Sequence, residues 1–377
     1  MRAGLDSGRA ISGRAIRRLA GLSAGAVVLA AACSAPAAPT TAPTAAPTAA
    51  PTTAPASAPA ASQAAASPSA AVNADPLDLA YISFAVANSY DAPMLASAQA
   101  AASANNATIT VMDGNLDPGT QVKLLQDAVA SGKYDGVILQ PVYGAGLVEG
   151  AKAAIAAGVA VGNIDQILGT DNTTANLQVD GQSSNVVFVP SELGRKIGEL
   201  VVKACGDTKP CEVGYIWSVK AAALDTALKA AFDKATAVNP DIKVVAEGES
   251  FYVTANGLKA AQDMLTAHPE IDVITGADQA ITGALQAVTD AGLKDKIKLV
   301  GYGGGAIAFQ GIKSGDRYGT VMQAPATEGR QGTEDFIKAI RTGQPQPGVD
   351  VLANLPDGGV ATSENVDQFL PLAEWPG

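Results

Sequence analysis

The loop 88–91, of sequence Asn-Ser-Tyr-Asp, brings together an amide, a hydroxyl, an aromatic ring and a carboxylate, a richer set than a plain turn needs. It follows an apolar strand at 79–84 and precedes an alanine-rich helix with Pro93 near its start, where helices tolerate proline. In an open α/β sheet such a loop lies at the carboxyl ends of the strands, where ligands bind. The same residue types also form turns and helix N-caps, so a purely structural loop is the alternative.

The elements that must position this loop alternate regularly from Leu77 onward. The predicted strands lie at 79–84, 107–112, 136–139, 159–163, 212–217, 242–246, 273–275, 297–301 and 318–322. Alanine-rich helices between them predict an α/β fold of mostly parallel sheets with helices on both faces. A polar stretch at 171–185 separates two sets of similar size, which predicts two similarly folded lobes. One core seldom grows beyond ~250–300 residues, so the length agrees with two.

The amino terminus has the pattern of an export signal. Arginines are frequent up to Arg18, an apolar run follows at 19–32, and Cys33 comes next. The run is too short to span a bilayer, which needs ~20 apolar residues. Its end, Leu-Ala-Ala-Ala-Cys, resembles a bacterial lipobox, which implies removal of residues 1–32 and lipidation of Cys33. Ordinary cleavage that leaves Cys33 a free thiol is the alternative, and Arg17 with Arg18 also permits twin-arginine export.

Residues 34–74 are almost wholly Ala, Pro, Thr and Ser, and together with the candidate lipidation site Cys33 they make up a predicted disordered tether at 33–76. Such a composition cannot bury enough surface to fold, and its prolines favour an extended tether with a reach of at most about 100 Å. An anchor and tether would hold the globular part outside the cytoplasmic membrane. Cys205 and Cys211 fit that compartment, because they bracket a helix-to-strand turn and predict a local disulfide. Closing so small a loop contributes roughly 2 kcal/mol.

Other functions have weaker support. The net charge of −11 argues against nucleic acid, whose binding needs a basic face. The single histidine, His268, has no converging Ser and Asp and is too isolated for a zinc site, and 113–117 lacks the glutamate of a calcium loop. The run 301–306 fits GxGxxA, the fingerprint of an NAD-dependent sugar dehydrogenase. Its helix is short and the expected acidic residue is absent, so we expect no catalysis, cofactor or metal.

Several stretches taken together resemble the periplasmic sugar-binding proteins of ABC importers, most closely the ribose-binding type. They are Leu-Thr-Ala-His-Pro-Glu at 265–270, Val-Ile-Thr-Gly-Ala-Asp-Gln at 273–279, Gly-Ala-Leu-Gln-Ala at 283–287, Leu-Val-Gly-Tyr at 299–302, Thr-Val-Met-Gln-Ala-Pro at 320–325 and Gly329. The run Gly-Arg-Lys-Ile-Gly at 194–198 and the loop 88–91 match the same family. The resemblance therefore covers essentially all of 77–368.

The resemblance implies a type I periplasmic binding protein fold, with two Rossmann-like lobes, a three-segment hinge and sugar held between the lobes. The crossings would fall near 186–190, 323–326 and 351–355. The amino-terminal lobe would then be 77–188 plus 324–352, and the carboxy-terminal lobe 189–323 plus 353–377. A few backbone torsions in such a hinge can absorb closure.

The resemblance also implies the binding residues, which would surround the sugar hydroxyls with polar groups and cover its apolar face with rings. Family positions are matched or conservatively replaced by Asn88, Tyr90, Gln140, Asp165, Tyr252 and Gln323, and the further candidates are Asp91, Gln166, Trp217 and Tyr302. Structural alternatives stay open: Asp165 could cap a turn, Tyr252 could be core, Gln140 could satisfy strand-end backbone, and Trp217 could pack between lobes. We expect Asp278 to be the N-cap of the helix 279–291 rather than a ligand group.

Departures from the ribose-binding pattern bear on the ligand. Gln166 stands where that pattern has Arg, a second Arg near 224–228 is missing, and Ala277 and Gly303 replace Asn and Asp. Each lost charge-assisted bond removes ~1.5–3 kcal/mol, so we expect a neutral sugar or polyol other than ribose.

The expected protein is therefore an extracytoplasmic, membrane-anchored lipoprotein that acts as a monomer and passes its ligand to the ABC permease. A sensor that presents sugar to a receptor is the non-transport alternative. Sugar-responsive regulators resemble the same fold, but they begin with a DNA-binding helix-turn-helix where this chain has a signal and tether.

Overall fold

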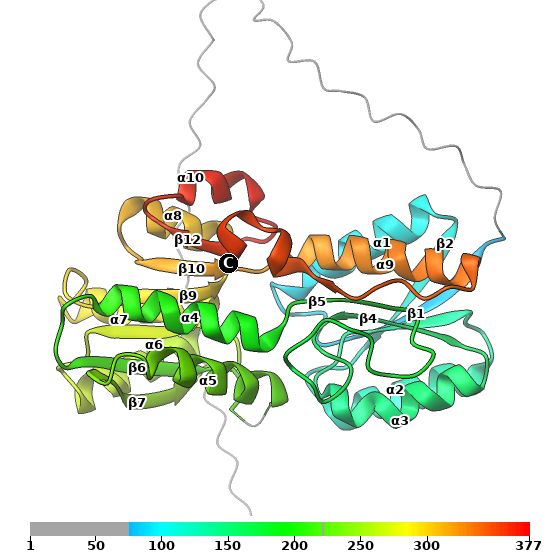
Figure 1. The fold of residues 1–377 in the computed structure, drawn as a ribbon, viewed down its shortest axis with the longest axis horizontal. Helices are drawn as coiled ribbons and strands as arrows, with labels where there is room; N and C mark the ends of the chain where they lie inside the picture. The colour runs from blue at the N-terminus through cyan, green and yellow to red at the C-terminus, as the bar shows by residue number, and fades with distance from the viewer. Residues whose placement is uncertain (1–74, 221) are drawn as a thin grey trace, which may run out of the picture. The chain divides into compact units, whose positions relative to one another are not determined.

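The computed structural model describes residues 75–220 and 222–377, and in these ranges it contains two six-stranded sheets (Figure 1). The strand orders are β11-β5-β4-β3-β1-β2 and β12-β10-β9-β8-β6-β7. Neighbouring strands are parallel, except that β12 runs antiparallel to β10. The predicted fold class is confirmed. The signal, the candidate lipidation site Cys33 and most of the tether lie outside the described residues.

The amino-terminal lobe is built around the first sheet. Its strands are β1 (Leu77–Ser83), β2 (Ala107–Asp113), β3 (Gly136–Leu139), β4 (Ala160–Asp165), β5 (Ser184–Val187) and β11 (Val349–Asp350). Its helices are α1 (Asp91–Ala104), α2 (Pro118–Ser131), α3 (Gly144–Ala156) and α9 (Pro325–Thr342). Leu79 and Tyr81 of β1 pack with α1 and α9, whereas Ala80 and Ile82 pack with α2 and α3. Helices on both faces explain why the middle of the strand, 79–82, is an unbroken apolar run.

The carboxy-terminal lobe repeats this plan. Its strands are β6 (Cys211–Trp217), β7 (Ile242–Glu249), β8 (Val273–Ala277), β9 (Lys298–Gly303), β10 (Gly319–Met322) and β12 (Val360–Thr362). Its helices are α4 (Pro190–Cys205), α5 (Ala223–Thr236), α6 (Thr254–Ala267), α7 (Asp278–Asp290), α8 (Ala306–Ser314) and α10 (Val366–Phe369). Helices α4 and α5 lie together against one face, and α6 and α7 lie together against the other (Figure 1).

The chain passes between the two sheets at three places. It leaves the first sheet after β5, returns to that lobe after β10, and leaves again after β11 through short 3₁₀ turns at Val351–Asn354 and Pro356–Gly359. Three crossings are what the fold class predicts for a hinged pair of lobes. They bring the carboxyl ends of both parallel sheets toward the same region, where ligands bind in open α/β folds.

Strand β5 was not predicted, because its first residues are polar. Ser184 and Asn185 are nevertheless buried. The Asn185 side chain accepts a hydrogen bond from Nδ2 of Asn163 at 2.7 Å and donates one to the Ala175 carbonyl at 2.7 Å. With both its oxygen and its nitrogen hydrogen-bonded, an amide side chain can be buried in a strand at a position where an apolar side chain is expected.

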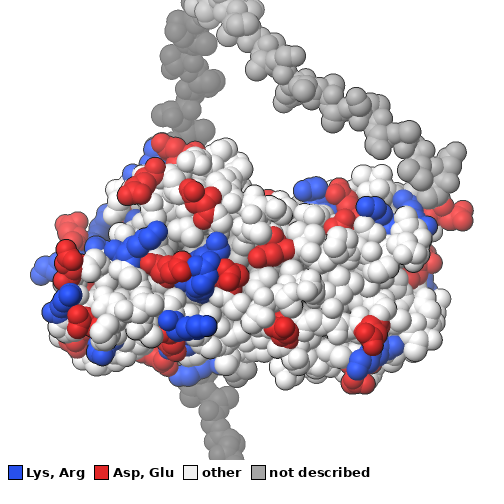
Figure 2. Space-filling model, in the orientation of Figure 1, with Lys and Arg blue, Asp and Glu red and all other residues white. Residues whose placement is uncertain are grey.

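Cys205 and Cys211 form the predicted disulfide, which joins the end of α4 to the first residue of β6. Both cysteines are buried among apolar residues of the carboxy-terminal lobe. None of the helices in the described ranges is long and apolar enough to cross a membrane. On the face in Figure 2, acidic and basic side chains are interspersed over the carboxy-terminal lobe.

Candidate functional site

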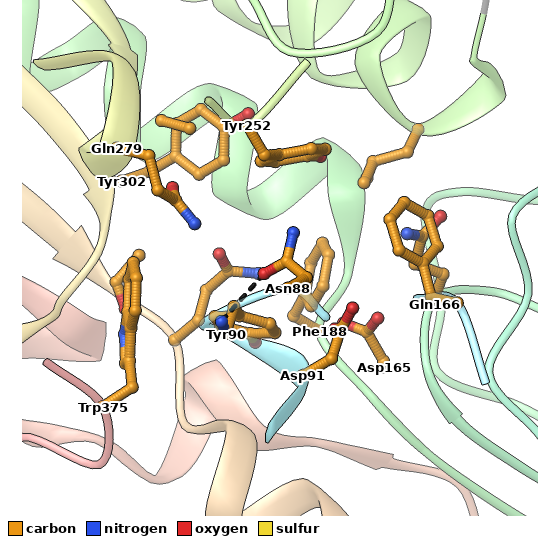
Figure 3. Close-up of a pocket in the computed structure, with 15 residues that line it drawn as sticks. Asn88, Tyr90, Asp91, Asp165, Gln166, Phe188, Tyr252, Gln279, Tyr302 and Trp375 are labelled. Atoms are coloured by element: carbon orange, nitrogen blue, oxygen red, sulfur yellow. Dashed lines mark hydrogen bonds between the residues drawn. The ribbon is translucent and has the colours of Figure 1, made fainter. Parts of the chain in front are cut away.

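A cavity with about 440 Å³ of empty space, part of it open to solvent, lies where the two lobes meet, at the carboxyl ends of the central strands (Figure 3). From the amino-terminal lobe and the crossings it is lined by Phe84, Asn88, Tyr90, Asp91, Asp165, Gln166, Phe188 and Gln323. From the carboxy-terminal lobe it is lined by Leu224, Tyr252, Ala277, Gln279, Tyr302, Gly303 and Trp375. Two of the ten predicted ligand residues, Gln140 and Trp217, are not in the lining. Contributions from both lobes make this cavity the candidate ligand site.

Two carboxylates form one side of the cavity and share a single amide donor. Nε2 of Gln140 donates to Oδ1 of Asp91 at 2.7 Å and to Oδ2 of Asp165 at 3.1 Å. Oε1 of Gln140 accepts from the backbone N–H of Phe84 at 3.0 Å. Gln140 therefore lies behind the site. It bonds the backbone at the end of β1, which is the structural role considered as an alternative above, and it also holds both carboxylates in place.

Burial makes these carboxyl groups unusually easy to protonate. It raises the pKa of Asp165 to about 7 and, together with the neighbouring Asp165, raises the pKa of Asp91 well above its usual range. Glu328, fully buried beneath Tyr90, also has a raised pKa because of burial and the nearby Asp165. Oδ2 of Asp91 finds no hydrogen-bond partner in the described part of the chain. The site thus offers a carboxyl oxygen that a ligand hydroxyl can engage.

Asp165 adopts a backbone conformation that is rare for residues other than glycine. Its φ is 69°, in the left-handed region, at the last position of β4. Such a conformation costs about 1–3 kcal/mol and persists where the surroundings enforce it, often at ligand sites. The conformation lets the side chain enter the cavity, where it is 3% exposed. It is not explained by a simple turn-capping role.

Phenol hydroxyls line the opposite wall. Oη of Tyr302 and Oγ of Ser218 are 2.6 Å apart, and Tyr252 lies beside them in the lining. Burial raises the pKa of Tyr252 and Tyr302 well above the usual value, so both remain neutral and can donate or accept hydrogen bonds. Asp225, below this wall, accepts from the Ser218 N–H at 2.8 Å, and burial raises its pKa to about 7.

Aromatic rings cover the remaining apolar sides. Phe84 of one lobe meets Tyr252 of the other edge to face, with centroids 6.2 Å apart. Tyr90 and Trp375 make a second edge-to-face pair at 5.6 Å, again between the lobes. In Figure 3 the rings of Tyr90, Tyr252 and Trp375 surround a space into which Asn88 and Gln279 point from opposite lobes. Rings beside amides are the combination expected around a molecule with both hydroxyl and C–H faces.

The structure contradicts two predictions from the sequence, that Trp217 contacts the ligand and that Asp278 is a helix N-cap. The Trp217 indole lies on the α5 side of the sheet, where Nε1 donates to Glu247 at 3.1 Å and the ring packs against Tyr215. Asp278 is not an N-cap, because α7 begins at that residue and Ala277 precedes it without a side-chain cap. Its buried carboxylate instead binds Arg317 and the Gly304 N–H, at 2.9 and 2.6 Å.

Seven lining residues were not among the candidates. Leu224, Ala277 and Gly303 lie where departures from the ribose-binding pattern were noted, and the other four are Phe84, Phe188, Gln279 and Trp375. Phe84 and Phe188 follow strands β1 and β5, so the rule that ligands bind at strand ends could have found them. Gln279 lies in the first turn of α7, in the same kind of strand-to-helix connection as the loop 88–91. Trp375 gave no local signal, because it is brought to the cavity only by the fold.

Local hydrogen bonds bear on the dinucleotide motif and on the calcium-like loop. In the GxGxxA run, the Gly304 N–H is already taken by Asp278, so it is not available to a dinucleotide phosphate. In the loop 113–117, Oδ1 of Asp113 accepts from Oγ of Ser83 and from the backbone of Val86 and Asn115. Across the described ranges, no three His, Cys, Asp or Glu side chains are grouped to hold a metal ion.

Known proteins resemble this chain over most of its length. A family model described as the periplasmic binding protein domain matches residues 79–345. The D-allose-binding periplasmic protein of Escherichia coli K12 is 26% identical over 241 residues, which cover 60% of this chain and 72% of that protein. The D-ribose/D-allose-binding protein of Pseudomonas aeruginosa is 25% identical over 246 residues, covering 64% and 73%.

Solved structures share the arrangement of the two lobes. A Mycobacterium smegmatis ABC transporter solute binding protein with bound glycerol superposes with a TM-score of 0.67 at 23% identity, covering 80% of this chain and 99% of that one. The Caulobacter myo-inositol binding protein gives 0.67 at 22% identity, covering 78% and 95%. At such low sequence identities, the structural similarity is evidence for the fold only. Membership of the family is shown by the family model, which matches more than half of the chain. The chain belongs to the periplasmic binding protein domain family and has its two-lobed, type I fold.

Proposed function

We propose that this protein is an extracytoplasmic solute-binding component of an ABC importer and binds a neutral sugar or polyol between its lobes. The supporting observation is the chemistry of the cavity, where amides, phenols and two carboxyl groups alternate with aromatic rings. No lysine or arginine is among the described residues that line it. An anionic solute would therefore meet Asp91 and Asp165 without a compensating charge, which disfavours sugar acids and phosphates.

The names of similar proteins support the same class of ligand. Curated relatives are named for D-allose and D-ribose, and structural neighbours hold glycerol or myo-inositol. All of these are small, uncharged and rich in hydroxyl groups. The residues that we propose for binding are the predicted Asn88, Tyr90, Asp91, Asp165, Gln166, Tyr252, Tyr302 and Gln323, joined by Gln279 and Trp375.

Ligand binding drives closure in this proposal. The lobes 77–188 plus 324–352 and 189–323 plus 353–377 would move as rigid bodies about the three crossings. A ligand that bonds Asp165 on one lobe and Tyr302 on the other makes more contacts in the closed form and so selects it. The closed protein then docks on the permease, which receives the ligand unchanged.

Titration calorimetry tests the ligand class. We expect at least one of D-ribose, L-arabinose, D-allose, D-galactose, D-glucose, myo-inositol and glycerol to bind with a Kd near 1 μM, about −8 kcal/mol. D-glucuronate, which matches D-glucose except for its carboxylate, should give no heat. The Trp217→Phe variant, changed outside the cavity, should bind like the wild type. Absence of binding by every neutral solute at a Kd below about 1 mM would refute the proposal.

The membrane anchor is part of the same proposal. Lipidation of Cys33 and the tether 33–76 would keep the binding lobes near the permease in the membrane. We expect the wild-type chain to sediment with membranes after export and the Cys33→Ala variant to appear in the soluble extracytoplasmic fraction. Equal distribution of both chains would remove the anchor from the proposal and leave ligand binding unaffected.

A further inference from the structure

Residues 373–377 attach to the carboxy-terminal lobe beside the cavity. The backbone N–H groups of Ala306 and Ile307, at the start of α8, donate to the carbonyls of Trp375 and Pro376, each at 2.9 Å. Nε1 of Trp375 donates to the Gly303 carbonyl at 3.0 Å. These three bonds hold the segment against the loop that follows β9.

The same segment reaches the other lobe through Glu374. One carboxylate oxygen accepts from the backbone N–H of Thr327 at 2.9 Å, and the other accepts from Oγ1 of Thr327 at 2.5 Å. Thr327 lies in the first turn of α9, whose N-terminus carries partial positive charge and so favours an anion. Residues 373–377 therefore bridge the two lobes at the edge of the cavity.

This bridge fixes the Trp375 indole as one wall of the cavity. The residue is 4% exposed, and its ring meets the Tyr90 ring edge to face. Gly303 permits the close approach, because a Cβ at that position would lie 2.7 Å from the indole ring. In Figure 3 Trp375 stands on the side of the cavity opposite Gln166, with the polar groups of Asn88 and Gln279 between them.

The chemistry of this wall is narrowly defined. The only polar atom of the indole, Nε1, is already bonded to Gly303, so the ring can offer a ligand only its apolar face. A sugar ring has C–H groups on a face and hydroxyls around its edge. Stacked on the indole, it would direct the hydroxyls toward the amides and carboxyls that line the neighbouring walls.

Resting on the proposed sugar-binding function, we infer that Trp375 is the stacking platform of the site and determines which solutes it accepts. Glu374 is its positioning residue, which holds the platform in place through Thr327. Cyclic solutes with an uninterrupted C–H face gain from the indole, whereas acyclic polyols such as glycerol gain little. The discrimination between D-allose or myo-inositol and glycerol therefore depends on Trp375.

The chain offers a direct test because it contains two tryptophans, of which Trp217 lies outside the cavity. In the Trp217→Phe variant, Trp375 is the sole indole, and its fluorescence should change on titration with the tightest-binding cyclic solute of the panel. The change should saturate at the Kd measured by calorimetry. In the matched Trp375→Phe variant, the remaining Trp217 signal should stay constant. An unchanged Trp375 signal at calorimetric saturation would overturn the inference.

Affinity provides a second readout. Trp375→Ala should weaken binding of that cyclic solute about tenfold or more, with a smaller loss for Trp375→Phe and little change for glycerol. Glu374→Ala, made in the Trp217→Phe background, should alter the Trp375 emission before ligand is added, and Glu374→Gln should restore it in part.

The outcomes separate this inference from the proposed function. If the wild type binds a cyclic solute and Trp375→Ala and Trp375→Phe, both with wild-type circular dichroism, bind it within twofold of the wild type, the platform is refuted and sugar binding stands. If no solute of the panel binds the wild type, the proposed sugar-binding function is refuted, and the inference on Trp375, which rests on it, is refuted with it. If Trp375→Ala does not fold, the fluorescence titration of Trp217→Phe, which retains the native indole, decides alone.

Discussion

Asp165→Asn is expected to weaken ligand binding about a hundredfold while making the folded protein more stable. Asparagine keeps the size of the side chain and tolerates the left-handed backbone at φ 69°, so the site keeps its shape. At pH 8, above the pKa of about 7 of Asp165, the change replaces charge-assisted hydrogen bonds to ligand hydroxyls, each worth ~1.5–3 kcal/mol, by weaker neutral ones. Calorimetry with the tightest-binding solute of the panel measures the loss.

The stability gain follows from the raised pKa of Asp165, about 7 when folded against an ordinary value of 3.8. Between these values the folded chain binds more protons than the unfolded chain, so stability falls as pH rises and the full penalty is present above pH 7. At ~1.4 kcal/mol per pKa unit the penalty is several kcal/mol. The unfolding temperature of Asp165→Asn should therefore exceed that of the wild type, by more at pH 8 than at pH 5.

Asp225 provides the matched control. Burial raises its pKa to the same value, about 7, but it does not line the cavity. Asp225→Asn should also reduce the fall in stability between pH 5 and pH 8, without a hundredfold loss of affinity. Wild-type affinity in Asp165→Asn would exclude this carboxyl group from the ligand site.

Asp278→Ala is expected to lower the free energy of unfolding by about 3–5 kcal/mol, as typical when one partner of a buried ion pair is removed. Oδ1 of Asp278 lies 2.9 Å from Nη1 of Arg317, and their side chains are 1% and 0% exposed. Thr320 donates to the same carboxylate, as does the backbone of Gly304. Without Asp278, the guanidinium stays buried with no opposing charge.

Urea unfolding of Asp278→Ala distinguishes this arrangement from a helix cap, whose loss would lower stability by only ~1 kcal/mol. The double variant Asp278→Leu with Arg317→Met, which removes both charges and keeps apolar volume, should recover much of the loss. A decrease below about 1 kcal/mol in Asp278→Ala would contradict the role of this pair. Gly303, which precedes Gly304, lines the cavity and accepts a hydrogen bond from Trp375, so we also expect weaker ligand binding in the single variant.

How far the sequence predicted this molecule depended on how local each signal was. Strand β3 was predicted with its observed bounds, because parallel strands covered on both faces are short apolar runs between helices. Strand β5 was missed because it begins with two polar residues, and the amide of the second, Asn185, is hydrogen-bonded to Asn163 and Ala175. Trp217 was misplaced, because alternation along a strand puts a side chain on one face or the other and does not say which face borders the ligand.

The ligand site shows the same division. The loop 88–91 was found because ligands bind at strand ends, a rule that needs only the order of elements. Gln140 and Asp165 were named because the resemblance to the sugar-binding family implied them. Gln140 also lies at a strand end, but it is behind the site. Its amide nitrogen donates to Asp91 and Asp165, and its amide oxygen accepts from the backbone N–H of Phe84. Trp375 follows no such rule, because its partner Gly303 is 72 positions away in the sequence.

The order of strands and helices, the two-lobed fold and the disulfide between neighbouring cysteines were determined by the sequence alone, because each rests on periodicity or spacing within a short segment. Tertiary structure alone decided which polar groups remain free to meet a ligand, which carboxyl groups are buried enough to hold a proton, and which ring closes the cavity. Those properties depend on contacts between segments far apart in the chain, because these side chains are buried only when the two lobes have folded and are in contact.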